Sequence, residues 1–128
     1  MRRVVLDTNV LIQFLRTPER FVDVLGAYDQ IVLAPVVVGE YRAGITQTRV
    51  GEENLRALEE FMDNPAVEEF SMTSDTGVAY AKIYRQLRQH GTPIPTNDMW
   101  IAAVAMECGC ALFTRDAHFR NIDGLILA

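Results

Sequence analysis

The chain has 128 residues, a mass of 14.4 kDa, 49% hydrophobic residues and a net charge of −5. This size predicts one domain over residues 1–128 with a sizeable core. No apolar run approaches the ~20 residues of a membrane-spanning helix, and the N-terminus lacks a secretory signal, so we predict a cytoplasmic protein with no membrane contact. The acidic balance argues against a domain that binds nucleic acid mainly through a basic surface.

Short apolar segments alternate with amphipathic ones along the whole chain. Hydrophobic periodicity, prolines and capping residues predict, in chain order, a strand at residues 3–6, helices at 9–15 and 18–28, a strand at 31–33, helices at 35–45 and 52–62, a strand at 67–70, helices at 74–90 and 97–107, and strands at 111–114 and 124–127. Alternation of this kind predicts an α/β fold. We expect a three-layer α/β/α sandwich around a central parallel sheet of four to five short strands.

Four acidic residues lie beside predicted core elements. Asp7 ends the first strand, Glu40 lies in an apolar helix, Asp98 opens another helix and Asp116 follows a late strand. Taken singly, Asp7 and Asp98 are also explained as helix caps and Asp116 as a turn residue. Glu40 is the hardest to explain in this way, because its neighbours are apolar on both sides. Ligands bind beyond the carboxyl ends of parallel strands, so Asp7 and Asp116 belong to that edge and the other two can converge there. Clustered carboxylates repel one another, and a hard divalent cation compensates them.

The order and spacing of these motifs resemble one known family. The motifs are Asp7-Thr8-Asn9 after the first strand, Glu40 on the third helix, Asn97-Asp98 before Ile101-Ala102-Ala103, and Thr114-Arg115-Asp116 after a late strand. Over essentially its whole length the chain resembles PIN domains, and more narrowly the VapC ribonuclease toxins of toxin–antitoxin pairs. The resemblance implies a metal-dependent endoribonuclease that leaves a 5′-phosphate and a 3′-hydroxyl.

The resemblance also implies roles for single residues. Asp7 and Asp98 would be the main ligands of Mg²⁺ or Mn²⁺, and Glu40 and Asp116 would complete the acidic pocket. Three polar residues would support these carboxylates or contact phosphate, namely Thr8, Asn9 and Thr114. Arg115 would contact RNA phosphate, although a pairing with a site carboxylate or a solvated position also fits the sequence.

The remaining reactive side chains carry weaker signals. His118 lies two residues beyond Asp116, near the expected site. Metal chemistry needs no histidine acid–base pair, so the sequence does not favour a catalytic role for His118 and leaves its contribution open. Cys108 and Cys110 are too few for a zinc site and, being so close in sequence, bridge poorly. We therefore predict that both are reduced.

The expected partners are an RNA substrate, a VapB-like antitoxin and a second copy in a homodimer. Residues that could form an exposed apolar surface for a partner are Phe14, Phe21, Tyr28, Phe61 and Met62. Two other functions stay open. One is a metal-dependent phosphatase, although the second aspartate of such sites is replaced by Asn9 and Lys82 is the single lysine. The other is a PIN-fold binding or RNA-processing protein outside a toxin–antitoxin pair.

Overall fold

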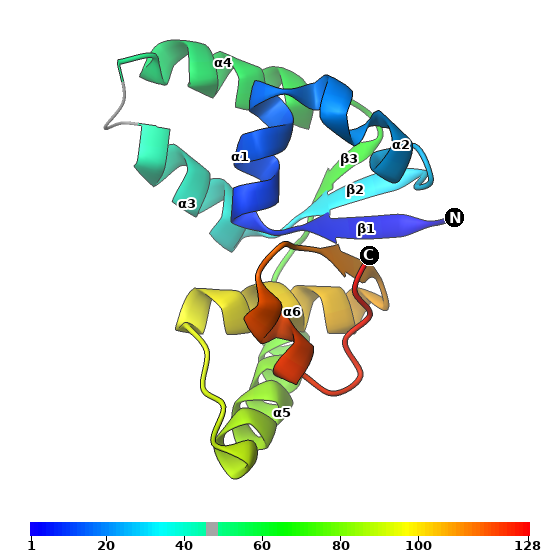
Figure 1. The fold of residues 1–128 in the computed structure, drawn as a ribbon, viewed down its shortest axis with the longest axis vertical. Helices are drawn as coiled ribbons and strands as arrows, with labels where there is room; N and C mark the ends of the chain where they lie inside the picture. The colour runs from blue at the N-terminus through cyan, green and yellow to red at the C-terminus, as the bar shows by residue number, and fades with distance from the viewer. Residues whose placement is uncertain (46–48) are drawn as a thin grey trace.

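The computed structural model describes residues 1–45 and 49–128, and within them a sheet of four parallel strands forms the middle of the molecule (Figure 1). The strands are β1 (Arg3–Leu6), β2 (Gln30–Leu33), β3 (Val67–Glu69) and β4 (Ala111–Phe113). Their order is β3-β2-β1-β4, so β1 lies between β2 and β4. From β1 the chain adds β2 and then β3 toward one edge of the sheet, and it then adds β4 on the other side of β1. The strand order therefore reverses beside β1.

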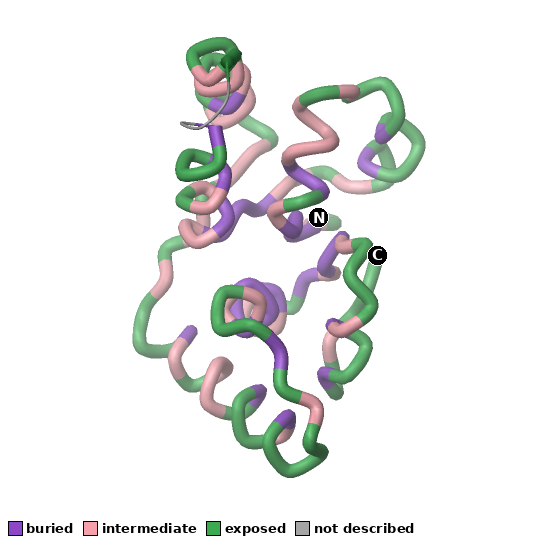
Figure 2. The backbone as a smooth tube through the Cα atoms, turned by 60° about the vertical axis from the view of Figure 1, so that its left-hand side comes forward, coloured by how far each residue is buried: buried purple, intermediate pink, exposed green. Residues whose placement is uncertain are grey.

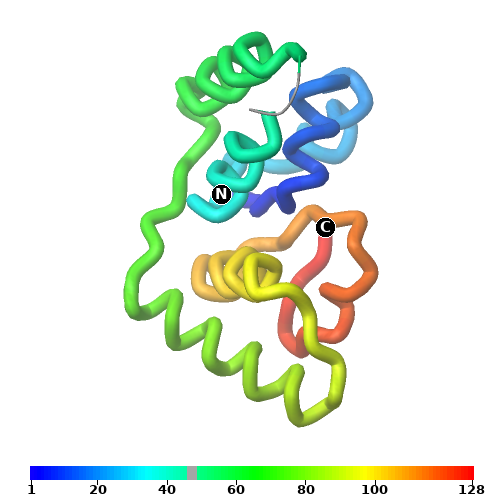
Figure 3. Tube along the Cα trace, turned by 90° about the vertical axis from the view of Figure 1, so that its left-hand side faces the viewer, coloured from blue at the N-terminus to red at the C-terminus, as the bar shows by residue number. Residues whose placement is uncertain are grey.

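Helices cover both faces of this sheet. One layer holds α1 (Thr8–Arg16), the 3-10 helix η1 (Pro18–Phe21), α2 (Val22–Leu25), α3 (Pro35–Ile45) and α4 (Gly51–Met62); the other holds α5 (Ser74–His90), α6 (Thr96–Cys108) and the 3-10 helix η2 (Ala117–Asn121) (Figure 1). The segment from α4 through β3 to α5 carries the chain from one layer to the other (Figure 3). The predicted three-layer α/β/α fold is confirmed.

The core extends over both faces of the sheet, and one continuous buried part lies where α6 and the sheet meet. Val4, Val5 and Leu6 of β1 are fully buried, because a strand covered on both faces has no solvent side. Residues 101–105 of α6 are also fully buried, and they include three alanines that allow the helix to approach the sheet closely. Figure 2 shows this concentration of buried residues in the strands and in α6. None of the described helices is long and apolar enough to cross a membrane.

Two predicted elements differ from the structure. The helix expected over residues 18–28 is instead η1 followed by the one-turn α2, because Phe21 has φ −111° and ψ 1° and interrupts the helical backbone. The strand expected over residues 124–127 reduces to an isolated bridge between Leu127 and Leu112. The sheet therefore has the lower of the two strand numbers we expected.

The apolar residues predicted to form an exposed surface pack inside the first helical layer instead. Phe21 is buried, and the ring of Phe14 lies 5.9 Å from that of Phe21 and 5.1 Å from that of Phe61. Tyr28 and Met62 are half-buried against the same core. The prediction of an exposed patch is wrong because the ring of Phe14 on α1 packs between those of Phe21 on η1 and Phe61 on α4.

The prediction that the two cysteines are reduced is also wrong. The structure joins Cys108 and Cys110 in a disulfide across the end of α6. Gly109 between them has a left-handed backbone with φ +67°, which turns the chain sharply and brings the two Cα atoms to 5.4 Å. That separation lies within the ordinary range for disulfides, whereas sequence proximity alone suggested poor geometry.

Candidate functional site

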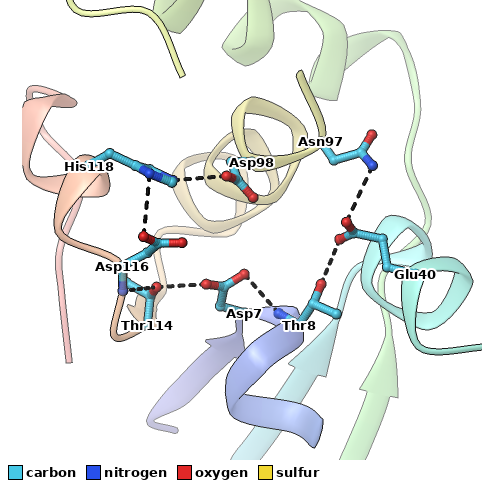
Figure 4. Close-up of polar contacts among 8 residues, drawn as sticks. All are labelled: Asp7, Thr8, Glu40, Asn97, Asp98, Thr114, Asp116 and His118. Carbon is cyan, nitrogen blue, oxygen red and sulfur yellow. Dashed lines mark hydrogen bonds and ion pairs between the residues drawn. The ribbon is translucent and has the colours of Figure 1, made fainter. Parts of the chain in front are cut away.

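One pocket of about 440 Å³ collects all four of the acidic residues singled out in the sequence. We call it the acidic pocket; it is lined by Asp7, Thr8, Asn9, Glu40, Pro95, Thr96, Asn97, Asp98 and Asp116. It opens at the carboxyl ends of β1 and β4, beside the reversal of strand order, which is where α/β sheets place their ligand sites. Figure 4 shows the four carboxylates converging from different elements.

Asp7 is the most deeply held of the four carboxylates. It is 3% exposed and sits between the end of β1 and the start of α1, where Oδ1 accepts a hydrogen bond of 2.8 Å from the Thr8 amide. Oδ2 accepts a 2.7 Å bond from the Thr114 hydroxyl at the end of β4 (Figure 4). Burial raises the pKa of Asp7 above 3.8; these two hydrogen bonds oppose the shift, and the charges of Asp116 and Glu40 add to it.

Glu40 reaches the pocket from the middle of α3. Its Oε1 accepts a 2.6 Å bond from the Thr8 hydroxyl, and its Oε2 accepts a longer 3.4 Å bond from the Asn97 side-chain amide (Figure 4). Thr8 thus links two carboxylates, through its amide to Asp7 and through its hydroxyl to Glu40. This arrangement fixes the carboxylates while leaving each of them oxygen lone pairs for another ligand.

Asp98 and Asp116 meet on the other side of the pocket, and His118 lies between them. Asp98 is in the first turn of α6, and its Oδ2 is 2.9 Å from Nε2 of His118 on η2. Nδ1 of the same ring is 3.4 Å from Oδ1 of Asp116 (Figure 4). The 2.9 Å contact is an ion-pair distance and not an aligned hydrogen bond, because Nε2 has no partner of hydrogen-bond geometry among the described residues.

Two residues of the site were given no role from the sequence, namely Asn97, which donates to Glu40, and His118. The sequence places His118 two residues after Asp116, and that spacing alone gives no direction to the side chain. The short η2 helix turns the ring back toward Asp98, so that one ligand atom from each of Asp98, Asp116 and His118 falls within 4.8 Å of the others. Recognising a 3-10 turn at residues 117–121 would have been the available signal.

The charge of the acidic pocket is strongly one-sided. Four carboxylates line it, and among the lining residues that the structure describes there is no lysine or arginine. The pKa of Asp98 is raised above 3.8, first by burial and next by the charge of Asp7, while the His118 contact lowers it. Closely spaced carboxylate oxygens with one imidazole nitrogen are a donor set suited to a divalent cation. The residues present therefore fit a metal ion.

The structure places seven of the eight predicted site residues in or against the acidic pocket. Asp7, Thr8, Asn9, Glu40, Asp98 and Asp116 line it, and Thr114 holds Asp7 and accepts a 3.0 Å bond from the Asp116 amide. Arg115 points away from the pocket, since it donates to the side chain of Gln13 and lies over the ring of Phe21 at 5.2 Å. The chemical roles of these residues stay predictions.

Comparison with known proteins identifies the family. The PIN domain model matches residues 4–125. The chain belongs to the PIN-domain family. This PIN domain is 32% identical over 122 residues to Ribonuclease VapC4 of Mycobacterium tuberculosis, an alignment that covers 93% of the chain and 90% of the relative. It is 30% identical over 124 residues to Ribonuclease VapC5 of the same organism, covering 94% and 87%.

Solved structures share the fold of this PIN domain. VapBC2 from Rickettsia felis, bound to a promoter DNA fragment, contains a chain that matches with a TM-score of 0.85 and 23% identity over 98% of this chain and 97% of that one. VapBC-5 from Mycobacterium tuberculosis, a member of the VapBC family of toxin–antitoxin systems, matches with a TM-score of 0.74 and 24% identity over the full length of both chains. At these identities the structures establish the fold.

Proposed function

We propose that this PIN domain is a VapC-type endoribonuclease toxin that hydrolyses RNA phosphodiester bonds at the acidic pocket. Its curated relatives carry the name ribonuclease and match nearly the whole chain. The observation that carries the proposal from family to chemistry is the convergence of four carboxylates, from β1, α3, α6 and the end of β4, in one pocket without a balancing lysine or arginine among its described lining residues.

Asp7 and Asp98 are the residues we propose as the main metal ligands, with Glu40 and Asp116 completing the set. Bound there, Mg²⁺ or Mn²⁺ supplies a Lewis acid that offsets charge on a phosphodiester and lowers the pKa of a water molecule. Thr8 and Thr114 orient the ligands, since their hydrogen bonds fix both oxygens of Asp7 and one of Glu40. His118 holds Asp98 and Asp116 near each other and offsets part of their charge when protonated.

The reaction needs an RNA phosphate at the mouth of the pocket. Asn9 and Asn97 line that mouth, and their side-chain amides are suited to donate to phosphate oxygens. Attack by water and departure of the 3′-oxygen would leave a 5′-phosphate and a 3′-hydroxyl. The 2′-hydroxyl has no part in such a reaction, so the products distinguish this route from that of ribonucleases that rely on histidine acid–base pairs.

We also propose the assembly and setting of the protein. Its structural neighbours include a toxin–antitoxin pair, which supports a VapB-like antitoxin as partner. A homodimer, a cytoplasmic location and the function of residues 1–128 as one domain complete the proposal. Light scattering after size-exclusion chromatography measures the mass of the protein alone and together with a co-expressed antitoxin, and a monomer at micromolar concentration would contradict the homodimer.

Cleavage of labelled RNA by the purified protein tests the activity. Cutting should occur with Mg²⁺ or Mn²⁺, stop with EDTA, and disappear in Asp7→Asn. The matched control is Asp75→Asn, the same chemical change at an exposed position in the first turn of α5. Mass spectrometry of the sample excludes a co-purified antitoxin. Cutting by Asp7→Asn at the wild-type rate would contradict the proposed site, and 5′-hydroxyl products would contradict the proposed chemistry.

A further inference from the structure

A second polar pocket lies toward the end of α1, whose first residues line the acidic pocket, and it carries the opposite charge. It has a volume of about 290 Å³ and is lined by Gln13, Arg16, Thr17, Arg20, Phe21 and Arg115. We call it the arginine pocket. Three of its six lining residues are arginines, and no carboxylate is among the described residues that line it. In a protein with a net charge of −5, such a concentration of positive charge in one hollow needs an explanation.

Among the residues that the structure describes, the arginines of this pocket have no carboxylate partners. Among residues 1–45 and 49–128, the ion pairs join Arg3 to Glu68 and His118 to Asp98 and Asp116, and none involves Arg16, Arg20 or Arg115. Arginines placed for stability normally pair with an acid or lie apart on the surface. Three unpaired guanidinium groups around one hollow repel one another, so the site is suited to an anion that offsets their charge.

Arg115 is held in place before any anion binds. Its Nη1 donates to Oε1 of Gln13, and its guanidinium lies over the ring of Phe21, 5.2 Å from the ring centre. Both contacts leave other N–H groups of the guanidinium free to donate, because arginine has five. A stacked and hydrogen-bonded guanidinium loses little freedom on binding, which favours recognition of phosphate oxygens.

Helix α1 and the segment that follows β4 each contribute residues to both pockets. Arg115 stands between Thr114, which holds Asp7, and Asp116, which lines the acidic pocket. On α1, Asn9 lines the acidic pocket while Gln13 and Arg16 line the arginine pocket. These three residues share one face of the helix, and Gln13 and Arg16 lie about 6 Å and about 10 Å beyond Asn9 along its axis.

We propose that the arginine pocket binds a backbone phosphate of the RNA substrate, adjacent along the strand to the phosphate cleaved in the acidic pocket. This inference rests on the proposed ribonuclease function. A polymer of phosphates supplies one anion to each pocket at once, whereas an isolated anion or an acidic peptide explains the arginines but not the elements that they share with the acidic pocket. The neighbouring phosphate anchors the RNA strand through ground-state binding, and among the described residues the arginines form no ion pair with the proposed metal ligands.

Binding of uncut RNA tests the proposal without any catalysis. A fluorescent single-stranded RNA oligonucleotide is titrated in EDTA over a range of salt concentrations. Arg20→Gln should weaken binding about tenfold, the effect expected when a charge-assisted hydrogen bond is removed. The slope of log Kd against log salt should fall by about 0.7 for each phosphate that the variant no longer neutralises. Arg20→Lys, which keeps the charge, should retain most of the slope.

The matched control is Arg85→Gln, because Arg85 is exposed on α5 and does not line the arginine pocket. It should bind RNA with the wild-type Kd and salt slope. Thermal melting of each variant establishes that it is folded. A wild-type Kd and slope in folded Arg20→Gln and Arg16→Gln would overturn the proposal. So would binding of poly-glutamate that depends on Arg20 while RNA binding does not, since that result assigns the pocket to an acidic peptide.

Kinetics separate this proposal from the ribonuclease function on which it rests. Hydrolysis of a small activated diester, bis(p-nitrophenyl) phosphate, by the wild-type protein tests the chemistry of the acidic pocket separately, because this substrate has no neighbouring phosphate for the arginine pocket. On RNA, Arg20→Gln should raise KM with little change in kcat, because the arginine binds ground-state substrate. If metal-dependent RNA cleavage has the same KM and kcat in Arg20→Gln as in the wild type, the proposed role of the arginine pocket is wrong and the proposed ribonuclease function still stands. If RNA binding depends on Arg20 but no metal-dependent cleavage occurs, the result supports phosphate binding by the arginine pocket and contradicts the proposed ribonuclease activity.

Discussion

At the scale of single residues, the pKa of Asp98 indicates that the charge of the acidic pocket lowers the free energy of unfolding of the metal-free protein. Its pKa is raised above 3.8, first by burial and then by the charge of Asp7. A carboxyl with a raised native pKa binds its proton more tightly in the folded than in the unfolded state. The free energy of unfolding therefore falls as pH rises from 3.8 through the native pKa, and the decrease is complete above it.

Asp98→Asn should therefore stabilise the metal-free protein while abolishing metal-dependent cleavage. At pH 7 we expect the free energy of unfolding to rise by an amount on the order of 1 kcal/mol, the size common for single stabilising substitutions. At pH 3 both forms are uncharged at this position, and the gain should vanish. Urea unfolding in EDTA at the two pH values measures it. Equal stability of wild type and variant at pH 7 would show that His118 fully compensates the charge of Asp98.

Thr114 should act on metal binding through Asp7. Its hydroxyl donates 2.7 Å to Oδ2 of Asp7 and accepts from the Asp116 amide at 3.0 Å, so one side chain orients one proposed ligand and the backbone of another. We expect Thr114→Val to lower Mn²⁺ affinity about 10- to 100-fold, as for other groups that orient metal ligands. Calorimetric titration with Mn²⁺ checks this. Thr114→Ser keeps the hydroxyl and should bind as wild type; equal affinities in all three proteins would contradict the role.

The sequence allowed the convergence of the four carboxylates in one pocket to be predicted, whereas their chemical roles stay predictions. Asp7 and Asp116 follow apolar strands, and parallel strands bring their carboxyl ends to one edge. Arg115 and His118 were harder to place. Their side chains point where the turn between β4 and η2 directs them, and the sequence pattern of that turn does not reveal its dihedral angles. The backbone turn therefore directs His118 toward the acidic pocket and Arg115 away from it.

At the scale of elements, α5 owes its start to a reciprocal cap. The Thr73 hydroxyl accepts a 3.2 Å bond from the Asp75 amide, while the Thr76 hydroxyl accepts a 3.0 Å bond from the Thr73 amide and donates 2.7 Å to Glu107 on α6. Thr76 is fully buried, so the cap also joins α5 to α6. Since α6 carries Asp98, these hydrogen bonds support the helix that presents a proposed metal ligand.

Thr73→Ala should destabilise the fold without harming the site. Removal of an N-cap typically costs about 1 kcal/mol, and Thr73 does not line the acidic pocket. We expect an unchanged kcat on RNA below the melting temperature and a lower melting temperature by calorimetry. Ser71→Ala, at an exposed position before the cap, is the comparison and should melt as wild type. A decrease of kcat in Thr73→Ala at low temperature would mean that loss of the cap on α5 also displaces α6, the helix that carries Asp98.

Prediction of elements succeeded where periodicity extended over several turns and failed where it did not. The 17-residue helix α5 ends at Gly91, which has φ +67°, and both of its ends were predicted. The segment around Phe21 reads as helical because Pro18 and the apolar spacing suit a helix. Its ring, however, packs against Phe14 and Phe113, and this tertiary packing accompanies the break between η1 and α2.

At the scale of the whole molecule, a divalent cation should raise thermal stability. The carboxylates of the acidic pocket repel one another in the folded state, and a cation that binds only that state stabilises it by mass action. At 100 times its Kd the gain is about 2.7 kcal/mol. Melting curves with Mn²⁺, and again after EDTA, measure a shift that should reverse. Asp98→Asn should show a much smaller shift; an equal one would place the cation elsewhere.

The hydrogen bond between Thr114 and Asp7 joins residues 107 positions apart in the chain. Translation therefore fixes the order in which the site is assembled. A growing polypeptide carries Asp7 and Glu40 early, yet no nascent chain has a complete acidic pocket until the segment from Thr114 to His118 has emerged from the ribosome. Products of premature termination before Thr114 lack both Thr114 and Asp116, so they cannot form the complete acidic pocket.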